Sequence, residues 1–247
     1  MAIYNKMAEF YDALTGDVEY EKWADFYEKL FSRYFVKPET LLDLACGTGS
    51  MAKLMSLRGY DVIGVDASSE MLSAAFEKMS GFSKPPLLIC QKMEELDLYG
   101  TVDSVLCCLD SINYLNGVAA LNKAFKRVGL FLRPGGLFIF DVNTRQKFKN
   151  MHMQCYMQEK KDLFCVWQAE YNEDAKKADF YINFFERTNA DKYVRHTEHH
   201  TEHAFSLVEL ENALKIGGME ILDVFGEYEL RKANATDERI VIAARKK

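Results

Sequence analysis

The 247-residue chain has little of what marks a membrane or secreted protein. No apolar run approaches the roughly 20 residues that a helix needs to cross a bilayer. The residues that follow Met1 do not show the charged, apolar and small-residue pattern of a secretory signal peptide. We therefore expect a cytoplasmic protein with no membrane partner.

The cysteines do not have the spacing of a metal site, because no two of the six form a Cys-x-x-Cys pair. Several fall inside or at the ends of apolar segments, which is typical of free, buried thiols in a reducing cytoplasm. They are Cys46, Cys90, Cys107, Cys108, Cys155 and Cys165. We predict unpaired cysteines and no bound metal.

An excess of positive charge is also missing: 31 Lys and Arg residues stand against 37 Asp and Glu residues, and the net charge is −6. The basic stretches, Lys160-Lys161 and residues 245–247, are short and mixed with acids. A nucleic-acid-binding surface usually shows a basic stripe or patch. The composition argues against nucleic acid as a partner.

What the sequence does contain, between residues 40 and 143, is a regular alternation of short apolar segments with amphipathic ones, which predicts strands separated by helices. Strands that are apolar on both faces are typical of a parallel sheet covered by helices, and the short connections fit right-handed βαβ units. The predicted strands are 41–46, 62–65, 87–90, 102–109 and 137–142. We predict an α/β fold with a Rossmann-like, doubly wound sheet.

Residues 144–205 break this alternation. They contain three long, aromatic, β-prone segments at 163–171, 180–187 and 193–205, separated by polar turns, of which the second spans 188–191. Such segments predict an antiparallel β insertion rather than further βαβ units. We expect this insertion to act as a lid.

Residues 206–247 return to the sheet pattern, with a capping box at Ser206 that opens a helix and strands at 220–225 and 239–244. With 40–143 they form one domain, whose mostly parallel sheet has seven predicted strands with helices on both faces. Residues 1–39 contain a helix from about residue 20 and form an N-terminal helical lid segment.

Two glycines separated by one residue follow the first predicted strand and lead into a helix. Gly47 and Gly49 let the backbone turn sharply and let a ligand approach the main chain. Asp66 ends the neighbouring strand, where its carboxylate would accept hydrogen bonds from both hydroxyls of a ribose. The alternative is that Asp66 caps the following helix, although Ser68 is already placed for that role.

Three segments resemble the motifs of the class I S-adenosylmethionine-dependent methyltransferases. The segment that resembles the first motif is Asp43-Leu44-Ala45-Cys46-Gly47-Thr48-Gly49. The segment that resembles the second motif is Val65-Asp66-Ala67-Ser68-Ser69-Glu70-Met71-Leu72. The family's turn before the fifth strand is matched by Leu132-Arg133-Pro134-Gly135-Gly136. The resemblance implies S-adenosylmethionine as the cofactor, S-adenosylhomocysteine as the product and an antiparallel hairpin at the end of the sheet. It also implies direct in-line methyl transfer to a small-molecule acceptor, catalysed mainly by proximity and orientation.

The same resemblance assigns the cofactor-binding residues. They are Tyr11, Trp23, Asp43, Ala45, Gly47, Thr48, Gly49, Asp66, Ala67, Met71, Gln91, Met93, Leu109 and Asp110. In the family, the glycine turn surrounds the methionine part, Asp66 holds the ribose, and Met71 and Met93 flank the adenine. Lys92 departs from the pattern, because relatives carry an acid there that accepts a hydrogen bond from the adenine. Since lysine has no acceptor, we expect Lys92 not to be a ligand.

Several of these residues have a structural role as an open alternative. For Met71 and Met93 the alternative is core filling, and Trp23 would equally belong to the buried stripe of its helix. On the acceptor side, Asn113 and Tyr114 are the candidates because they follow the fourth strand. Tyr114 would equally pack against a helix. The sequence offers no evident general base, so no residue is assigned a catalytic role.

Four histidines lie within eight residues, at His196, His199, His200 and His203. In a strand, His196 and His200 would share one face and His199 and His203 the other. Thr and Glu residues interleave them, so our main interpretation is a solvated strand of the insertion. A metal site and a histidine that binds the acceptor are the alternatives.

Two other functions fit parts of the pattern. A glycine turn followed by an acid also suits an NAD-dependent oxidoreductase, although Ala52 matches the third small residue of that fingerprint only in spacing. A protein that binds S-adenosylmethionine without turnover would also keep these residues. We predict methyl transfer, by an enzyme that is a monomer or a homodimer.

Overall fold

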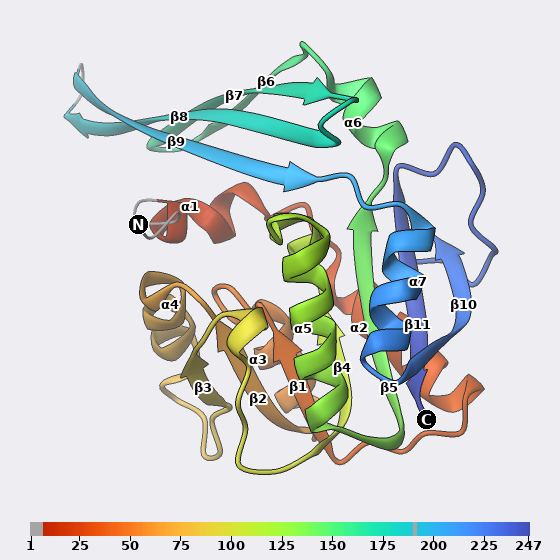
Figure 1. Cartoon of the computed structure of the whole chain (residues 1–247). Coiled ribbons are helices and arrows are strands. Elements are labelled where there is room, and N and C mark those ends of the chain that lie inside the picture. The colour runs from red at the N-terminus through yellow and green to blue at the C-terminus, as the bar shows by residue number, and fades with distance from the viewer. Residues whose placement is uncertain (1–6, 190–191) are drawn as a thin grey trace.

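A seven-stranded sheet forms the centre of the molecule (Figure 1). The computed structural model describes residues 7–189 and 192–247. The strands, in spatial order, are β10 (Met219–Gly226), β11 (Arg239–Lys246), β5 (Leu132–Asn143), β4 (Val102–Cys107), β1 (Thr40–Leu44), β2 (Asp61–Asp66) and β3 (Leu87–Cys90). The first five strands of the chain pair in parallel, and β11 is antiparallel to both β5 and β10. The predicted doubly wound, mostly parallel sheet with a final antiparallel hairpin is confirmed.

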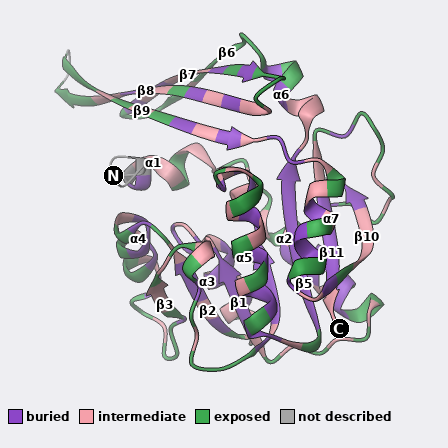
Figure 2. Cartoon of the chain, in the orientation of Figure 1, coloured by how far each residue is buried: buried purple, intermediate pink, exposed green. Residues whose placement is uncertain are grey.

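Helices cover both faces of this sheet. Consecutive strand residues point to opposite faces, so Leu42 packs in the core beneath α5 (Gly117–Phe131) and α7 (Leu207–Ile216), whereas Leu41 packs beneath α2 (Tyr20–Arg33) and α3 (Ser50–Leu57). The central strands are accordingly buried along their length (Figure 2). The helix α4 (Ser69–Met79) lies beside α3 and reaches β2 and β3.

A second, four-stranded antiparallel sheet lies beyond the carboxyl ends of the parallel strands (Figure 1). It consists of β6 (Cys155–Lys160), β7 (Leu163–Asn172), β8 (Lys177–Asn189) and β9 (Lys192–His203), and α6 (Arg145–Met151) leads into it. The antiparallel insertion is confirmed, and the turn predicted at 188–191 lies partly outside the described residues. The sequence did not predict β6, because nearly all of its residues are exposed and carry no alternating pattern.

A short helix, α1 (Met7–Leu14), lies between the two sheets (Figure 1). Phe10 and Leu14 pack against the inner face of the antiparallel sheet at Leu163, Cys165 and Phe184. On its other side, Asp12 accepts hydrogen bonds from Thr48 Oγ1 at 2.6 Å and from Lys78 Nζ at 2.9 Å. The N-terminal segment is therefore attached both to the insertion and to the glycine turn. Among the described residues, no helix is long and apolar enough to cross a membrane.

Candidate functional site

A cavity of about 810 Å³ lies at the carboxyl ends of the parallel strands, between that edge of the sheet and the elements α1 and β9. Small-molecule sites usually have volumes of about 300–1,000 Å³. Its walls come from the loops after β1, β2, β3 and β4, from Tyr11 and Thr15, and from the end of β9. Open α/β sheets bind their ligands at this edge.

The glycine turn borders this cavity, and its two glycines have different reasons to lack a side chain. Both have positive φ, at 54° for Gly47 and 73° for Gly49. A Cβ on Gly47 would have no heavy atom within 4 Å, so this glycine leaves open space where a ligand can approach the backbone. A Cβ on Gly49 would lie 3.0 Å from Ala75 Cβ and Met79 Cε, so the second glycine lets α4 pack closely.

Asp66 reaches the cavity from the end of β2, next to the glycine turn. One carboxylate oxygen accepts a hydrogen bond from Gly47 N at 2.9 Å and the other from Ser68 N at 2.8 Å. Each oxygen has a second lone pair, so the carboxylate retains the capacity to accept two ribose hydroxyls. Burial raises the pKa of Asp66, and these backbone amides oppose the rise. The helix cap is Ser68, which accepts a bond from Met71 N, so the capping alternative for Asp66 is wrong.

Asp43 lies just behind the turn and is only 3 % exposed. Its Oδ2 atom has no hydrogen-bond partner among residues 7–189 and 192–247. Burial raises the pKa of Asp43 to about 7, and the charge of Asp66 adds to the rise. A buried carboxylate with one oxygen unsatisfied is costly, so a positively charged ligand in the neighbouring cavity would stabilise it.

The loop after β4 is held in an unusual conformation. Leu109 and Asp110 have φ values of 56° and 50°, which side-chain-bearing residues rarely adopt. The strand therefore ends at Cys107, earlier than the pattern of apolar residues predicts, and β1 ends at Leu44 because Ala45 has a φ of 59°. Strained residues cluster at functional sites, where the surrounding structure holds them in place.

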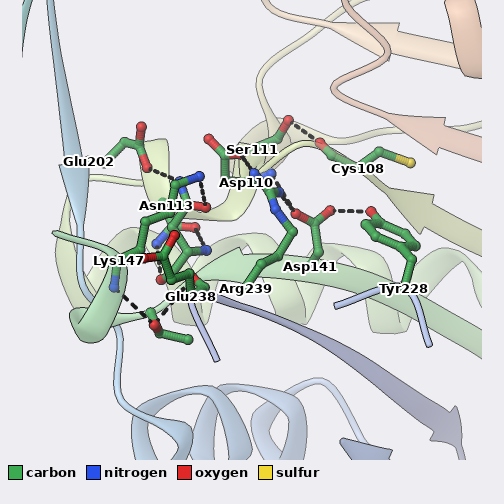
Figure 3. A network of polar contacts seen from close by, with 12 residues as sticks. Cys108, Asp110, Ser111, Asn113, Asp141, Lys147, Glu202, Tyr228, Glu238 and Arg239 are labelled. Carbon is green, nitrogen blue, oxygen red and sulfur yellow. Dashed lines mark hydrogen bonds and ion pairs between the residues drawn. The ribbon is translucent and has the colours of Figure 1, made fainter. Parts of the chain in front are cut away.

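What holds Asp110 is a buried ion cluster with Arg239 at its centre (Figure 3). Arg239 Nη2 donates to Asp110 Oδ1 at 2.5 Å, and Nη1 donates to Asp141 Oδ2. Asp141 also accepts from Asp110 N at 2.9 Å and from Tyr228 Oη at 2.8 Å. Burial opposes ionisation of Asp110, but the charges of Arg239 and Lys147 outweigh it and hold its pKa below the usual value.

A second cavity, of about 210 Å³, lies between this ion cluster and the antiparallel sheet. Asp110 and Tyr114 line both cavities. The walls of the smaller cavity are apolar on the side of β7 and β8, and polar on the side of α6, β5 and β9. They include Trp167, Phe180, Phe184, Asn143, Lys147 and Glu202.

Most of the predicted cofactor residues come together around the larger cavity. Those that line it are Tyr11, Ala45, Gly47, Asp66, Ala67, Met71, Gln91, Met93, Leu109 and Asp110. Lys92 lines it too, although we expected no ligand role for this residue. Thr48 and Gly49 lie in the turn and Asp43 in β1, and none of the three lines the cavity.

Two candidate residues have other contacts. Trp23 stacks on Tyr228, with ring centroids 3.9 Å apart, in the packing of α2 against the C-terminal segment. Asn113 is fully buried: its Nδ2 donates to the carbonyl oxygens of Asn143 and His203, and its Oδ1 accepts from Asn143 N. The amide of Asn113 therefore joins three segments, whereas Tyr114 lines both cavities.

The histidines form part of β9 as predicted, but the strand is not solvated along its length. His200 is 1 % exposed and bonds to Glu198 at 2.9 Å, and His199, His200 and His203 all border the larger cavity. The prediction of a solvated strand is wrong for this end of β9, because the strand passes over the site. No cluster of three or more metal-ligating side chains occurs in the described parts of the chain.

Asp141, Arg239 and Glu202 belong to the site but were not predicted from the sequence. Asp141 did carry a signal, because it is a charged residue inside the otherwise apolar segment 137–142. Arg239 begins the last strand, nearly 100 residues further along the chain, and Glu202 lies in the polar stretch that we interpreted as solvated. No pattern in the sequence around Arg239 or Glu202 links either residue to Asp141.

Comparison with known proteins identifies the family. The profile of a family described as a methyltransferase domain matches residues 41–136. The putative methyltransferase YqeM of Bacillus subtilis is 32% identical over 99% of this chain and 97% of its own length. A crystal structure of an S-adenosylmethionine-dependent methyltransferase from Clostridium acetobutylicum superposes with a TM-score of 0.88, at 33% identity and 98% coverage of both chains. The chain belongs to the class I S-adenosylmethionine-dependent methyltransferases.

The cofactor of this methyltransferase is S-adenosylmethionine, and the cavity fits it. The open space at Gly47 and the free lone pairs of Asp66 suit an adenosyl group, and Asp43 suits the positive charge of the methionine part. A similar fold occurs with this cofactor bound in CalS10 from Micromonospora echinaspora, at 20% identity over 96% of both chains and a TM-score of 0.76. The methyltransferase is thus an enzyme, and we set aside the NAD-dependent oxidoreductase.

Proposed function

We propose that this methyltransferase transfers the methyl group of S-adenosylmethionine to a small molecule that enters the 210 Å³ cavity. The observation that carries the proposal is that Asp110 and Tyr114 line both cavities, so a donor in one and an acceptor in the other would meet at these residues. Two structural neighbours, the amino pentose methyltransferase CalS10 and the sugar N-methyltransferase KedS8, support a small acceptor.

The cofactor would be held by residues from several loops. Asp66 would accept the ribose hydroxyls, Met71 and Met93 would flank the adenine, and the backbone at Gly47 would contact the methionine part. When bound, the sulfonium supplies a methyl group that is already activated for displacement. The protein then has to align the acceptor with the methyl–sulfur bond and exclude water, which is catalysis by proximity.

We also propose that α1 and the antiparallel sheet act together as the lid of this site. The inner face of the sheet contacts Phe10 and Leu14, and Lys78 Nζ joins Asp12 of α1 to Thr48 of the glycine turn at 3.0 Å. A cofactor that enters the cavity would pass between these elements.

We place the enzyme in the cytoplasm. The described cysteines are all free, which fits this reducing compartment.

Replacing Asp66 with Asn tests the ribose contact. We expect the affinity for S-adenosylhomocysteine to fall by about 5- to 150-fold, since a hydrogen bond to a charged group contributes about 1–3 kcal/mol. Calorimetric titration of the variant measures this change. Asp174→Asn, which removes an exposed carboxylate from the turn before β8, is the matched control and should bind as the wild type does. Equal affinity in Asp66→Asn and the control would contradict the contact.

Transfer of a labelled methyl group tests the small-molecule acceptor. The full-length enzyme is incubated with methyl-labelled S-adenosylmethionine and a cell extract, which is then separated into small molecules, protein and nucleic acid. We expect label in the small-molecule fraction, since the smaller cavity admits only a compact group. Label confined to protein or nucleic acid would reject the proposed acceptor class, while cofactor binding would be unaffected.

A further inference from the structure

Glu202 is a buried carboxyl group that faces the smaller cavity from β9. It is 3 % exposed, and its Oε2 atom accepts a hydrogen bond from Asn143 Nδ2 at 2.9 Å. Asn143 is in turn fixed by Asn113 and by Lys147 Nζ, which donates to Asn143 Oδ1 at 2.9 Å. The glutamate is therefore held in place at the wall of the proposed acceptor cavity (Figure 3).

The negative charges around this wall outnumber the positive ones when all the carboxyl groups are ionised. Three carboxyl groups, Asp110, Asp141 and Glu202, meet two cations, Arg239 and Lys147. Both aspartates bond to Arg239, whereas the hydrogen-bond partner of Glu202 is the neutral amide of Asn143. With all three carboxyl groups ionised, the cluster is one positive charge short of neutrality. A buried, uncompensated charge is unfavourable.

The environment of Glu202 favours its protonated, neutral form. Burial raises the pKa of Glu202 to about 8, and the negative charge of Asp110 adds to the rise. The titratable or charged groups near Glu202 are Asp110 in the loop after β4, Tyr114 after it, Asp141 on β5, Lys147 on α6, Arg239 on β11, Cys165 on β7 and His200 on β9 itself. A cation in the cavity would reverse this effect and favour the ionised carboxylate.

The opposite wall suits the rest of such a ligand. Trp167, Phe180 and Phe184 come from β7 and β8 and present apolar, aromatic surface to the cavity. Aromatic faces attract cations and also contact the apolar part of a small molecule. The cavity thus offers a carboxylate to a positive group and an aromatic floor to the body that carries it.

We propose that the methyl acceptor is a basic amine and that Glu202 binds its ammonium group and removes its proton. This inference rests on the proposed function, since it assumes that the acceptor occupies the smaller cavity. An ammonium nitrogen has no lone pair and cannot be methylated, so a proton has to leave first. Glu202, whose negative charge has no counter-ion at this wall, receives this proton.

The carboxylate of Glu202 takes one proton from the ammonium, and the freed nitrogen lone pair forms a bond to the methyl carbon. The bond between that carbon and sulfur breaks with its electron pair on sulfur, which leaves neutral S-adenosylhomocysteine. The positive charge passes from sulfur to the methylated nitrogen. Glu202 then releases its proton to water.

Binding of a probe pair tests the inference without turnover. Benzylamine and benzyl alcohol have nearly the same size, but only the first is a cation at pH 8. In the presence of saturating S-adenosylhomocysteine, we expect benzylamine to bind the full-length enzyme about tenfold or more tightly than the alcohol. Glu202→Gln should remove this preference, and Glu202→Asp should retain part of it. Glu170→Gln, which removes an exposed carboxylate from β7 of the same sheet, should leave the preference unchanged.

The affinity of the wild type for benzylamine provides a test that needs no variant. It should fall about tenfold for each pH unit below the Glu202 pKa of about 8, because the proton and the ammonium compete for one carboxylate. Equal binding of the two probes, undetectable binding of both at millimolar concentration, or an amine preference that survives in Glu202→Gln would overturn the inference. Such results would leave the proposed function standing if labelled methyl groups still reach small molecules.

Discussion

Replacing Arg239 with Met is expected to lower the free energy of unfolding by about 3–5 kcal/mol, the usual cost of removing one partner from a buried ion pair. Arg239 bonds to Asp110 and to Asp141, and the Asp141 side chain has no exposed surface. Met fills a similar volume, so the loss comes from two buried carboxylates without a cation. Urea unfolding followed by circular dichroism measures the change.

A surface pair provides the control for this substitution. Arg33 bonds to Asp223 at 3.3 Å with about half of its side chain exposed. Exposed ion pairs contribute about 0–1 kcal/mol, so Arg33→Met should unfold nearly as the wild type does. If Arg239→Met were as stable as Arg33→Met, the ion cluster would contribute nothing to the fold.

The Arg239→Met defect should also depend on pH. In the wild type, the pKa of Asp110 lies below its usual value, so its pairing stabilises the fold above the unfolded-state pKa and is lost as the pH falls. In the variant, burial without a cation raises the pKa of Asp110, so this carboxyl group is protonated in the folded state at low pH and stability falls as the pH rises. The two unfolding curves should therefore converge toward acid pH. A difference that is the same at pH 5 and pH 8 would contradict this account.

Replacing Gly129 with Ala is expected to lower the free energy of unfolding by about 3 kcal/mol or more. A Cβ at this position of α5 would clash with the carbonyl oxygen of Gly217, at the end of α7. The obstacle is backbone, so the two helices would have to move apart and open the core between them. In an unobstructed helix the same change would stabilise by about 1 kcal/mol, so the sign of the effect separates the two cases.

Gly81→Ala is the matched control, because a Cβ on Gly81 would meet no atom within 4 Å. We expect its midpoint of urea unfolding to stay close to that of the wild type. An unchanged midpoint in Gly129→Ala would show that α5 and α7 are not fixed at the separation described. Measuring both variants without cofactor keeps ligand binding from masking the difference.

The parts of the molecule that the sequence predicted are those with local signals. The apolar strands, the glycine turn and Asp66 were recognisable because their residues lie within one βαβ unit and their spacing has a physical cause. The ends of β1 and β4 were placed too late, since the positive φ of Ala45 and Leu109 follows from tertiary contacts and not from residue type. The edge strand β6 was missed because it is exposed.

The acceptor side was less predictable because distant segments build it. Glu202 and His200 lie in a run of polar residues that, taken alone, indicates a strand in water. Their burial follows from the position of β9 above the parallel strands. The hydrophobic periodicity of the sequence does not indicate this position. Trp23 illustrates the reverse case: the family resemblance suggests a cofactor contact, whereas this chain stacks the ring on Tyr228.

The position of Arg239 on the last strand has a consequence for synthesis of the enzyme. The glycine turn, Asp66 and the antiparallel sheet are all translated before the residue that neutralises Asp110 and Asp141. A nascent chain lacking β11 would carry two adjacent acids with no counter-charge at the junction of the two cavities. If the two cavities hold donor and acceptor as proposed, a chain that ends before β11 would lack the ion pairs that fix Asp110 between them, and we expect it to show no methyl transfer.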